Sequence, residues 1–318
     1  MNISAISLGT WQVGGKWGSD FNNDNAAAIL NKAVDAGINF IDTADVYSDG
    51  ESEKAVGRIL KSRSEKIYVA TKCGRQIQPH VNEGYQPAVL RKYVEDSLKR
   101  LQLETIDLIQ LHCPPTQVYY RPEIFELFNH LKKEGKIQHL GVSVEKVEEA
   151  LKAIEYDNVT TVQIIFNMFR QRPAQLFFEQ AIKKDIGVIV RVPLASGLLT
   201  GTFNKQTNFT AGDHRSFNRN GEAFDKGETF SGIDYETGLM AVEELKKIFP
   251  GHKNLAPAAL KWILQHEAVS CIIPGASTAQ QVDANLMALQ ENDLTKEQFD
   301  AVRQVYEKYI QPAVHHLW

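Results

Sequence analysis

Short apolar segments alternate with segments of helical periodicity along the whole of this 318-residue chain. Each apolar segment is long enough for one strand, and the segment after it repeats its apolar residues at the spacing of one helix face. Strict strand–helix alternation predicts a parallel sheet covered by helices. The eight predicted strands are 3–8, 39–45, 67–72, 106–112, 137–143, 160–166, 187–192 and 269–274.

The predicted helices carry residues that usually begin or end a helix. Asn23 or Asp24 is placed to cap the first of them, and Gly37 follows its last turn. Pro87 suits the first turn of another, where its missing N–H has no intrahelical partner to lose. The predicted helices are 24–36, 51–60, 87–101, 124–131, 144–154, 176–184, 234–248, 257–265, 279–289 and 296–310.

Eight strand–helix units without a change in composition predict one α/β domain over residues 1–318, a (β/α)8 TIM barrel. The main alternative is an open, doubly wound sheet. The first strand–helix turn lacks the G-x-G-x-x-G fingerprint with which such sheets bind phosphate, and this favours the barrel. One long polar loop, 201–232, follows the seventh strand, and loops of this length are usually functional lids or disordered.

Charge and cysteine content limit the partners. A net charge of −4 gives no basic field for nucleic acid, and no basic amphipathic segment suggests a membrane surface. No segment approaches the roughly eighteen consecutive apolar residues of a membrane span, and no signal peptide is evident. Cys73, Cys113 and Cys271 are far apart, which disfavours disulfides and zinc and favours a cytoplasmic location.

Polar side chains occupy the ends of three neighbouring predicted strands. Asp42, Lys72 and His112 lie at the ends of the second, third and fourth, and Tyr47 follows on the loop after Asp42. The carboxyl ends of barrel strands form the rim that carries the active site, so we expect these side chains to meet. Each alone has an ordinary explanation, such as a solvated strand end or a turn cap. Their shared position is much harder to explain by chance.

These four groups suit proton delivery to an oxygen that gains negative charge. The phenol of Tyr47 is a weak acid, and an ammonium beside it is expected to lower its pKa. Asp42 is expected to pair with Lys72, while His112 orients a carbonyl oxygen. The sequence shows no second carboxylate base, Ser–His pair or metal-ligand cluster. The reaction that fits is hydride addition to a carbonyl, which requires a cofactor.

The segments DTADVY, ATK and DLIQLHCPP resemble the motifs of the aldo-keto reductase superfamily, and the resemblance extends over essentially the whole chain. It implies a barrel that reversibly reduces aldehydes or ketones with a nicotinamide cofactor, usually NADPH. It also implies a role for each of the four residues. Tyr47 would be the general acid, Lys72 the residue that adjusts its pKa, Asp42 the ion-pair partner and His112 the orienting donor.

The same resemblance implies a cofactor site around the rim. Ser143 and Gln163 resemble contacts to the nicotinamide carboxamide, and 192–201 resembles the segment that wraps the pyrophosphate. Segment 274–278 links the last strand to a helix and so supplies a helix N-terminus for an anion. The expected cofactor-binding residues are Thr10, Trp11, Ser143, Gln163, Arg191, Pro193, Leu194, Ser196, Gly197, Leu199, Gly201, Gly275, Ser277, Thr278, Gln281 and Asn285.

Two positions depart from the family pattern. Arg191 stands where an aromatic residue often stacks on the nicotinamide, although a guanidinium can also stack or reach a substrate or phosphate group. Ser277 and Thr278 supply hydroxyls where many relatives carry a cation for the 2′-phosphate of NADP(H). Hydroxyls and helix N–H groups can bind phosphate with less electrostatic attraction, so NADP(H) remains the expected cofactor and NAD(H) the alternative. Thr278 and Gln281 also match a capping box, and both roles are compatible.

The expected substrate is a small carbonyl compound, and family members are often monomers, which slightly favours a monomer here. Arg215 and Arg219 of the long loop either attract anionic substrates or tether the loop. Aromatic side chains are candidates for the substrate pocket, with core packing as the alternative for each. These are Trp11, Trp17, Tyr47, Phe203, Phe217 and Phe224.

Two other functions remain open from the sequence. Barrels of this family also serve as cofactor-binding regulatory subunits of ion channels, although a pure binding protein has no need of Tyr47. Lys72 could instead act as a Schiff-base nucleophile, as in barrel aldolases. Asp42 beside it would keep the amine protonated, which disfavours that chemistry.

Overall fold

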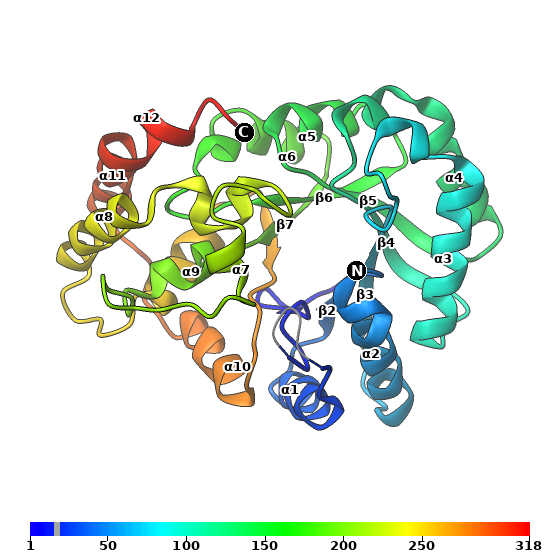
Figure 1. The fold of residues 1–318 in the computed structure, drawn as a ribbon, viewed down its shortest axis with the longest axis horizontal. Helices are drawn as coiled ribbons and strands as arrows, with labels where there is room; N and C mark the ends of the chain where they lie inside the picture. Colours follow the sequence, from blue (N-terminus) through cyan, green and yellow to red (C-terminus); the bar gives the residue numbers. More distant parts are fainter. Residues whose placement is uncertain (16–19) are drawn as a thin grey trace.

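The strands pair in parallel, in the order in which they occur in the chain, and curl into a barrel (Figure 1). The computed structural model describes residues 1–15 and 20–318. Backbone hydrogen bonds close the ring between the first and last strands. Ser7 N donates to Ile272 O at 2.9 Å, and Gly9 N donates to Pro274 O at 3.2 Å. The predicted (β/α)8 barrel is therefore confirmed, and the open sheet is wrong.

Two strands match their predicted bounds to the residue, and the first strand departs most. Residues 3–8 were predicted, whereas regular pairing covers only Leu8–Gly9, with an isolated bridge between Ile6 and Ile272. The strands are β1 (Leu8–Gly9), β2 (Phe40–Asp42), β3 (Tyr68–Cys73), β4 (Ile106–His112), β5 (Ile137–Ser143), β6 (Val159–Ile165), β7 (Gly187–Arg191) and β8 (Val269–Ile272).

Helices surround the barrel and cover its outer face (Figure 1). The helix predicted over 296–310 is interrupted by a π-helical turn, Tyr306–Ile310. No described helix has the length and apolarity needed to cross a membrane. The helices are α1 (Asn23–Asp35), α2 (Glu51–Ser62), α3 (Pro87–Leu101), α4 (Pro122–Lys133), α5 (Val147–Ala153), α6 (Phe177–Lys183), α7 (His214–Phe217), α8 (Tyr235–Ile248), α9 (Ala256–Leu264), α10 (Ala279–Leu286), α11 (Lys296–Val305) and α12 (Gln311–Val314).

The ends of the helices follow local sequence, with one correction. Asn22 caps α1, because its side chain accepts a hydrogen bond from Asn25 N at 2.8 Å; the predicted caps were one and two residues later. Gly37 has a φ of 86° just beyond the end of α1, as expected for the left-handed residue after a helix. Pro87 occupies the first turn of α3, as predicted.

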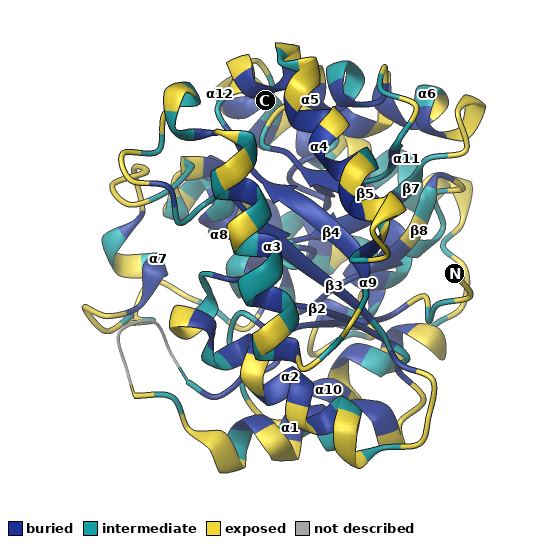
Figure 2. Cartoon of the chain, turned by 90° about the vertical axis from the view of Figure 1, so that its right-hand side faces the viewer, coloured by how far each residue is buried: buried dark blue, intermediate teal, exposed yellow. Residues whose placement is uncertain are grey.

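Side chains at alternate strand positions fill the barrel. Figure 2 shows the strands as buried and the outward faces of the helices as exposed. Successive residues of a strand point to opposite faces, so a residue two positions after an inward-facing one also points inward. One cluster of buried apolar residues collects such positions from five strands and the residue after β8: Phe40, Ala70, Leu108, Ile189, Cys271 and Ile273.

Candidate active site

Polar side chains replace this apolar layer towards the carboxyl ends of the strands. Asp42, Lys72 and Gln110 each lie two residues beyond a member of the apolar layer, so strand alternation places them inside the barrel. Lys72 is opposite Gln110 in the register of β3 and β4. Asp42 and Lys72 are each 1% exposed, so their charges must be satisfied within the protein.

Lys72 connects the two ends of this polar group. Its Nζ donates to Asp42 Oδ1 at 2.5 Å, to Thr43 O at 2.8 Å and to Tyr47 Oη at 3.3 Å. Burial favours a lower pKa for Lys72, but Asp42 and Tyr47 raise it above its ordinary value. The amine is therefore a charged ammonium, which is a poor nucleophile, and this argues against Schiff-base chemistry.

Two amides hold the second carboxylate oxygen of Asp42. Gln110 Nε2 donates to Asp42 Oδ2 at 3.0 Å, and Gln163 Nε2 donates to the same oxygen at 2.8 Å. Gln163, for which a contact with the nicotinamide carboxamide was predicted, therefore helps to fix the acid that pairs with Lys72. Gln110 was not predicted. Its one signal was a polar residue within the otherwise largely apolar strand IDLIQLH.

Tyr47 begins a tight turn after β2, in which Ser48 and Asp49 have φ values of 49° and 52°. Burial raises the pKa of Tyr47 above its ordinary value, and Lys72 opposes this rise only in part. The shift is opposite to the lowering that the sequence predicted, because burial outweighs an ammonium whose charge is shared with Asp42. The phenol stays protonated at neutral pH, which is the state that a proton donor needs.

His112 faces Tyr47 across the mouth, with ring centroids 5.9 Å apart and planes at 82°. Burial lowers the pKa of His112 well below its ordinary value, and the charges of Arg75, Lys72 and Arg191 lower it further. The imidazole is therefore neutral, with one N–H donor and one acceptor nitrogen. Its Nδ1 is buried without a hydrogen-bond partner in the described part of the chain.

Three more predicted cofactor residues lie on the same rim. Ser143 ends β5 and is completely buried. Thr10 follows β1, and its hydroxyl donates to Asp42 O at 3.1 Å, which ties the first loop to the strand that carries the acid. The ring of Trp11 lies 4.7 Å from the ring of His214, on the loop after β7.

The segment after β7 folds into a succession of left-handed residues. Ala195, Ser196 and Gly197 have φ values of 47°, 57° and 92°, and Gly201 has a φ of 72°. Such turns direct successive backbone N–H groups towards one side, which suits the binding of an anion. Leu199 was also predicted to contact the cofactor, and its side chain is completely buried in the hydrophobic core.

The second predicted phosphate region begins α10. Thr278 Oγ1 accepts a hydrogen bond from Gln281 N at 3.4 Å, and Gln281 Oε1 accepts one from Ser277 N at 2.7 Å. Thr278 therefore caps α10 as predicted, but the box is incomplete, because the side chain of Gln281 accepts from Ser277 N and not from Thr278 N. Asn285 Nδ2 donates to Gly275 O at 3.3 Å and fixes the turn after β8. The helix N-terminus suits a phosphate, although these five residues include no cation.

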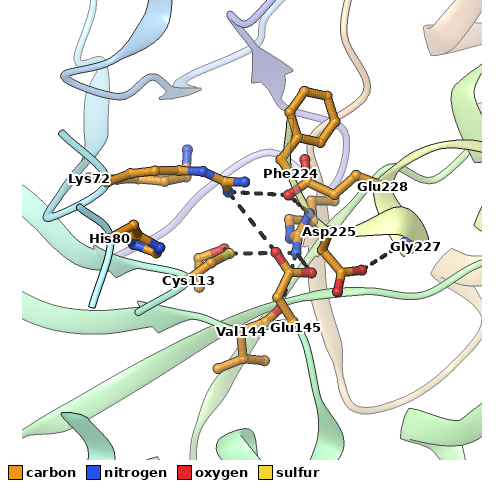
Figure 3. Close-up of polar contacts among 12 residues, drawn as sticks. Lys72, His80, Cys113, Val144, Glu145, Phe224, Asp225, Gly227 and Glu228 are labelled. Carbon is orange, nitrogen blue, oxygen red and sulfur yellow. Dashed lines mark hydrogen bonds and ion pairs between the residues drawn. The ribbon is translucent and has the colours of Figure 1, made fainter. Parts of the chain in front are cut away.

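Arg191 belongs to a network of ion pairs at the mouth. Its Nη2 donates to Glu145 Oε2 at 2.8 Å, and its Nη1 lies 3.6 Å from Glu228 Oε1. The same oxygen of Glu228 is 3.1 Å from Arg75 Nη1. Figure 3 shows Glu145 and Glu228 close to Cys113, which follows β4. The guanidinium of Arg191, whose role the sequence left open, is thus held by two carboxylates.

The sequence did not predict three members of this network. Arg75 and Glu145 each lie two residues beyond the end of a strand, on loops of the rim where barrel enzymes place functional residues. This position was the available signal for both. Glu228 had none, because it is one of many polar residues in a long loop, and only the folding of that loop brings it to the mouth.

The arginines of this loop have a structural role. Arg215 Nη2 pairs with Asp213 Oδ2 at 2.6 Å, and its guanidinium lies over the ring of Phe209, 4.6 Å from the centroid. Arg219 Nε donates to Arg215 O at 2.8 Å. Of the two predicted roles, these contacts correspond to tethering.

Aromatic residues of the loop pack partly on one another and partly on the rim. Phe224 lies 6.1 Å from the ring of Trp11 and 6.2 Å from that of Phe217. Phe203 makes a different contact, with the ring of Phe209 at 5.4 Å. Trp17 lies outside the described residues. The aromatic contact between Phe224 and Trp11 joins the long loop to the loop after β1.

The residues of the rim fit a nicotinamide dinucleotide. His112 Nδ1 and Arg191 Nε are buried polar atoms that lack partners in the described residues, so a bound group that hydrogen-bonds there would satisfy them. The turn at 195–197 and the N-terminus of α10 supply backbone N–H groups for phosphates.

Comparison with known proteins identifies the family. The model of the Aldo/keto reductase family matches residues 5–307. An NADH-specific methylglyoxal reductase of Escherichia coli (strain K12) is 29% identical over 316 residues, covering 92% of this chain and 91% of that protein. An aldo-keto reductase of Schizosaccharomyces pombe, whose name includes NADP(+), is 27% identical over 299 residues, covering 91% and 84%.

A solved structure gives the same result. The glycerol dehydrogenase from Gluconobacter oxydans superposes with a TM-score of 0.80 at 33% identity, covering 98% of this chain and 93% of that one. These relatives give no support to the regulatory-subunit alternative. The chain therefore belongs to the aldo/keto reductase family, and it is an oxidoreductase that reduces an aldehyde or ketone to an alcohol with a nicotinamide cofactor.

Proposed function

We propose that Tyr47 protonates the carbonyl oxygen and that Lys72, Asp42 and His112 prepare it for this step. The observation that carries the proposal is the position of Lys72 Nζ, 3.3 Å from Tyr47 Oη and 2.5 Å from Asp42 Oδ1 in a buried region. A bound reduced nicotinamide supplies the hydride. The residues of the chain then have to supply the proton and stabilise the charge that moves.

Lys72 stabilises the phenolate that Tyr47 becomes after proton transfer more than it stabilises the resting phenol. Tyr47 is protonated at rest, and its phenolate forms beside an ammonium when the proton leaves. An opposite charge at this distance in a buried site stabilises that phenolate, so the interaction strengthens as the reaction proceeds. Asp42 and its two amide partners keep Lys72 charged and in place.

His112 supplies the second hydrogen bond to the carbonyl oxygen. Its neutral imidazole carries one N–H, which can donate to the oxygen without itself giving up the proton. We assign the carboxamide of the cofactor to Ser143 and Gln163. The turn at 195–197 and the N-terminus of α10 hold its phosphates.

NADP(H) is the cofactor that we propose, with the hydroxyls of Ser277 and Thr278 and the N-terminus of α10 binding the 2′-phosphate. The two relatives named after a cofactor differ in the one they carry, NADH in one and NADP(+) in the other. Relatives named for methylglyoxal and glycerol suggest small carbonyl compounds as the first substrates to try. We also propose a cytoplasmic location, where the three free, buried cysteines stay reduced.

The test is to titrate the protein with NADPH and NADH, and then to follow nicotinamide absorbance with a panel of small aldehydes and ketones. We expect tighter binding of NADPH and a loss of absorbance that depends on the carbonyl compound. Preferential binding of NADH would reverse the cofactor assignment. Binding without turnover across the panel would contradict the proposed reaction.

A further inference from the structure

One carboxylate oxygen of the loop after β7 lies between two guanidiniums at the barrel mouth. Glu228 Oε1 is 3.1 Å from Arg75 Nη1 and 3.6 Å from Arg191 Nη1. The three side chains are only 15%, 22% and 10% exposed. Guanidiniums that converge in a partly desolvated site are a common way to bind a carboxylate or a phosphate. Here the bound anion is part of the chain.

The charges at this position balance only while Glu228 is present. The other carboxylate is that of Glu145, whose Oε2 lies 2.8 Å from Arg191 Nη2 and whose Oε1 lies 4.0 Å from Arg75 Nη1. If Glu228 moves away, two guanidiniums face one carboxylate. An incoming group with a negative charge would restore the balance and would replace Glu228 as the nearest carboxylate or phosphate partner of Arg75.

This anion position adjoins Tyr47 and His112, the two residues proposed to act on the carbonyl oxygen. After burial, Arg75 has the largest part in lowering the pKa of His112, and Glu228 is one of the charges that act on the pKa of Tyr47. The contact that fixes this proximity is that of Arg191 Nη2 with Cys113 Sγ, 3.6 Å apart, because Cys113 is the residue directly after His112. Figure 3 draws Glu228 in one cluster with Lys72, at the carboxyl end of β3.

Of the two carboxylates, Glu228 is the one whose segment adjoins an exposed part of a long loop. It is joined through a few residues to the tip of the loop, 219–223, which is exposed throughout, whereas Glu145 lies in the short connection between β5 and α5. Burial raises the pKa of Glu228 above its ordinary value, which Arg75 and Arg191 only partly offset. Its carboxylate is therefore less well stabilised at the mouth than its two cationic neighbours suggest.

The same cluster does not suit a metal ion. Cys113, Glu145 and Glu228 offer ligand atoms within 4.8 Å of one another. Arg75 and Arg191 already hold both carboxylates, so a metal cation would meet two guanidiniums at short range. Burial also raises the pKa of Cys113 far above its ordinary value, so no thiolate is available as a ligand.

We propose that Arg75 and Arg191 form a receptor for an anionic group on the carbonyl substrate, and that Glu228 occupies this receptor while no such substrate is bound. The substrate class is then a small aldehyde or ketone that carries a carboxylate or a phosphate group. This inference rests on the proposed function and narrows it.

Paired substrates test the receptor by kinetics. We would compare kcat/KM for 4-oxobutanoate with that for its methyl ester, and for glyceraldehyde 3-phosphate with that for glyceraldehyde. The larger of the two charged-to-neutral ratios identifies the preferred anion. In Glu228→Gln that ratio should rise about tenfold, because a competing carboxylate is removed, and in Arg75→Gln it should fall about tenfold.

Arg91→Gln is the matched control, because Arg91 pairs with Glu134 at 2.7 Å on the outer surface. It makes the same change of charge and side chain as Arg75→Gln, and the ratio should stay at the wild-type value. Equal ratios in wild type, Glu228→Gln and Arg75→Gln would overturn the proposal.

Calorimetric titration with succinate and with inorganic phosphate tests the receptor without turnover. Glu228→Gln should bind one of these anions about tenfold more tightly than the wild type, with NADP+ present or absent, and Arg75→Gln should lose this binding. The receptor proposal would be overturned if Glu228→Gln bound neither succinate nor phosphate. It would also be overturned if NADP+ displaced the anion completely, because the anion would then occupy the cofactor site. Anion binding as expected, with no carbonyl reduced, would support the receptor and contradict the proposed function.

Discussion

Replacement of Asp42 by Asn leaves a buried ammonium without its counter-charge. Lys72 is 1% exposed, and its other acceptors are Thr43 O at 2.8 Å and Tyr47 Oη at 3.3 Å, neither of which is charged in the resting state. Removing one partner of a buried ion pair costs about 3–5 kcal/mol. Burial then lowers the pKa of Lys72 with less opposition, and we expect the amine to lose its proton.

The same substitution should slow the reaction. A neutral amine no longer stabilises the phenolate that Tyr47 becomes, so the advantage of the positioned acid is lost. Acid–base catalysis of this kind contributes about 10²–10⁴-fold, and we expect kcat of Asp42→Asn to fall at least about 100-fold.

Urea denaturation and steady-state kinetics on three proteins separate the two effects. The double variant Asp42→Asn/Lys72→Met removes both charges, so most of the lost free energy of unfolding should return while activity does not. The control is Asp35→Asn, whose exposed pair with Arg63 at 2.6 Å should contribute less than about 1 kcal/mol. Asp42→Asn as stable as the control, or a double variant as unstable as the single one, would show that Asp42 does not compensate the charge of buried Lys72.

Three further predictions concern pH and the long loop. Since the pKa of Tyr47 is raised and that of His112 is lowered, kcat/KM for reduction should be flat between about pH 8 and pH 9, above the pKa of Asp45; a titration within that range would contradict these assignments. Burial raises the pKa of Asp45 from 3.8 to about 7, so its ionisation destabilises the fold as pH rises through this window. Asp45→Asn should therefore stabilise the protein at pH 8 by up to about 4 kcal/mol and lose this gain at pH 3.5; equal effects at both pH values would refute it. The ring of Trp318 lies 3.9 Å from the guanidinium of Arg170, and its Nε1 donates to Asp225 in the loop after β7. Trp318→Ala should therefore lower the free energy of unfolding by about 3 kcal/mol and speed amide exchange over 224–232. Leu317→Ala, at an exposed neighbour, should do neither.

Most of the fold could be predicted because its signals are local. Strand–helix alternation identifies the barrel, and the bounds of β4 and β5 follow from apolar segments that end in turn residues. The first strand could not be placed, because its pairing depends on closure against Ile272 and Pro274 at the other end of the chain. The cap of α1 was misplaced by one or two residues, since several neighbouring residues there can cap a helix.

The meeting of Asp42, Tyr47 and Lys72 was predictable because strand ends of a barrel share one rim. The direction of the Tyr47 pKa shift was not, since it depends on how burial compares with the charge of Lys72. Arg191 was recognised as unusual, yet its partner Glu228 lies in a loop without periodicity. Contacts made by such a loop leave no pattern in the sequence.

The most direct test of Tyr47 as the proton donor is kcat of Tyr47→Phe, measured with its affinity for the cofactor in the same preparation. The substitution removes only the phenolic hydroxyl, so cofactor affinity should stay close to that of the wild type. If Tyr47 donates the proton, kcat falls at least about 100-fold. A loss of kcat of less than about threefold would be far smaller than the contribution of a proton donor, and it would show that Tyr47 does not donate the proton.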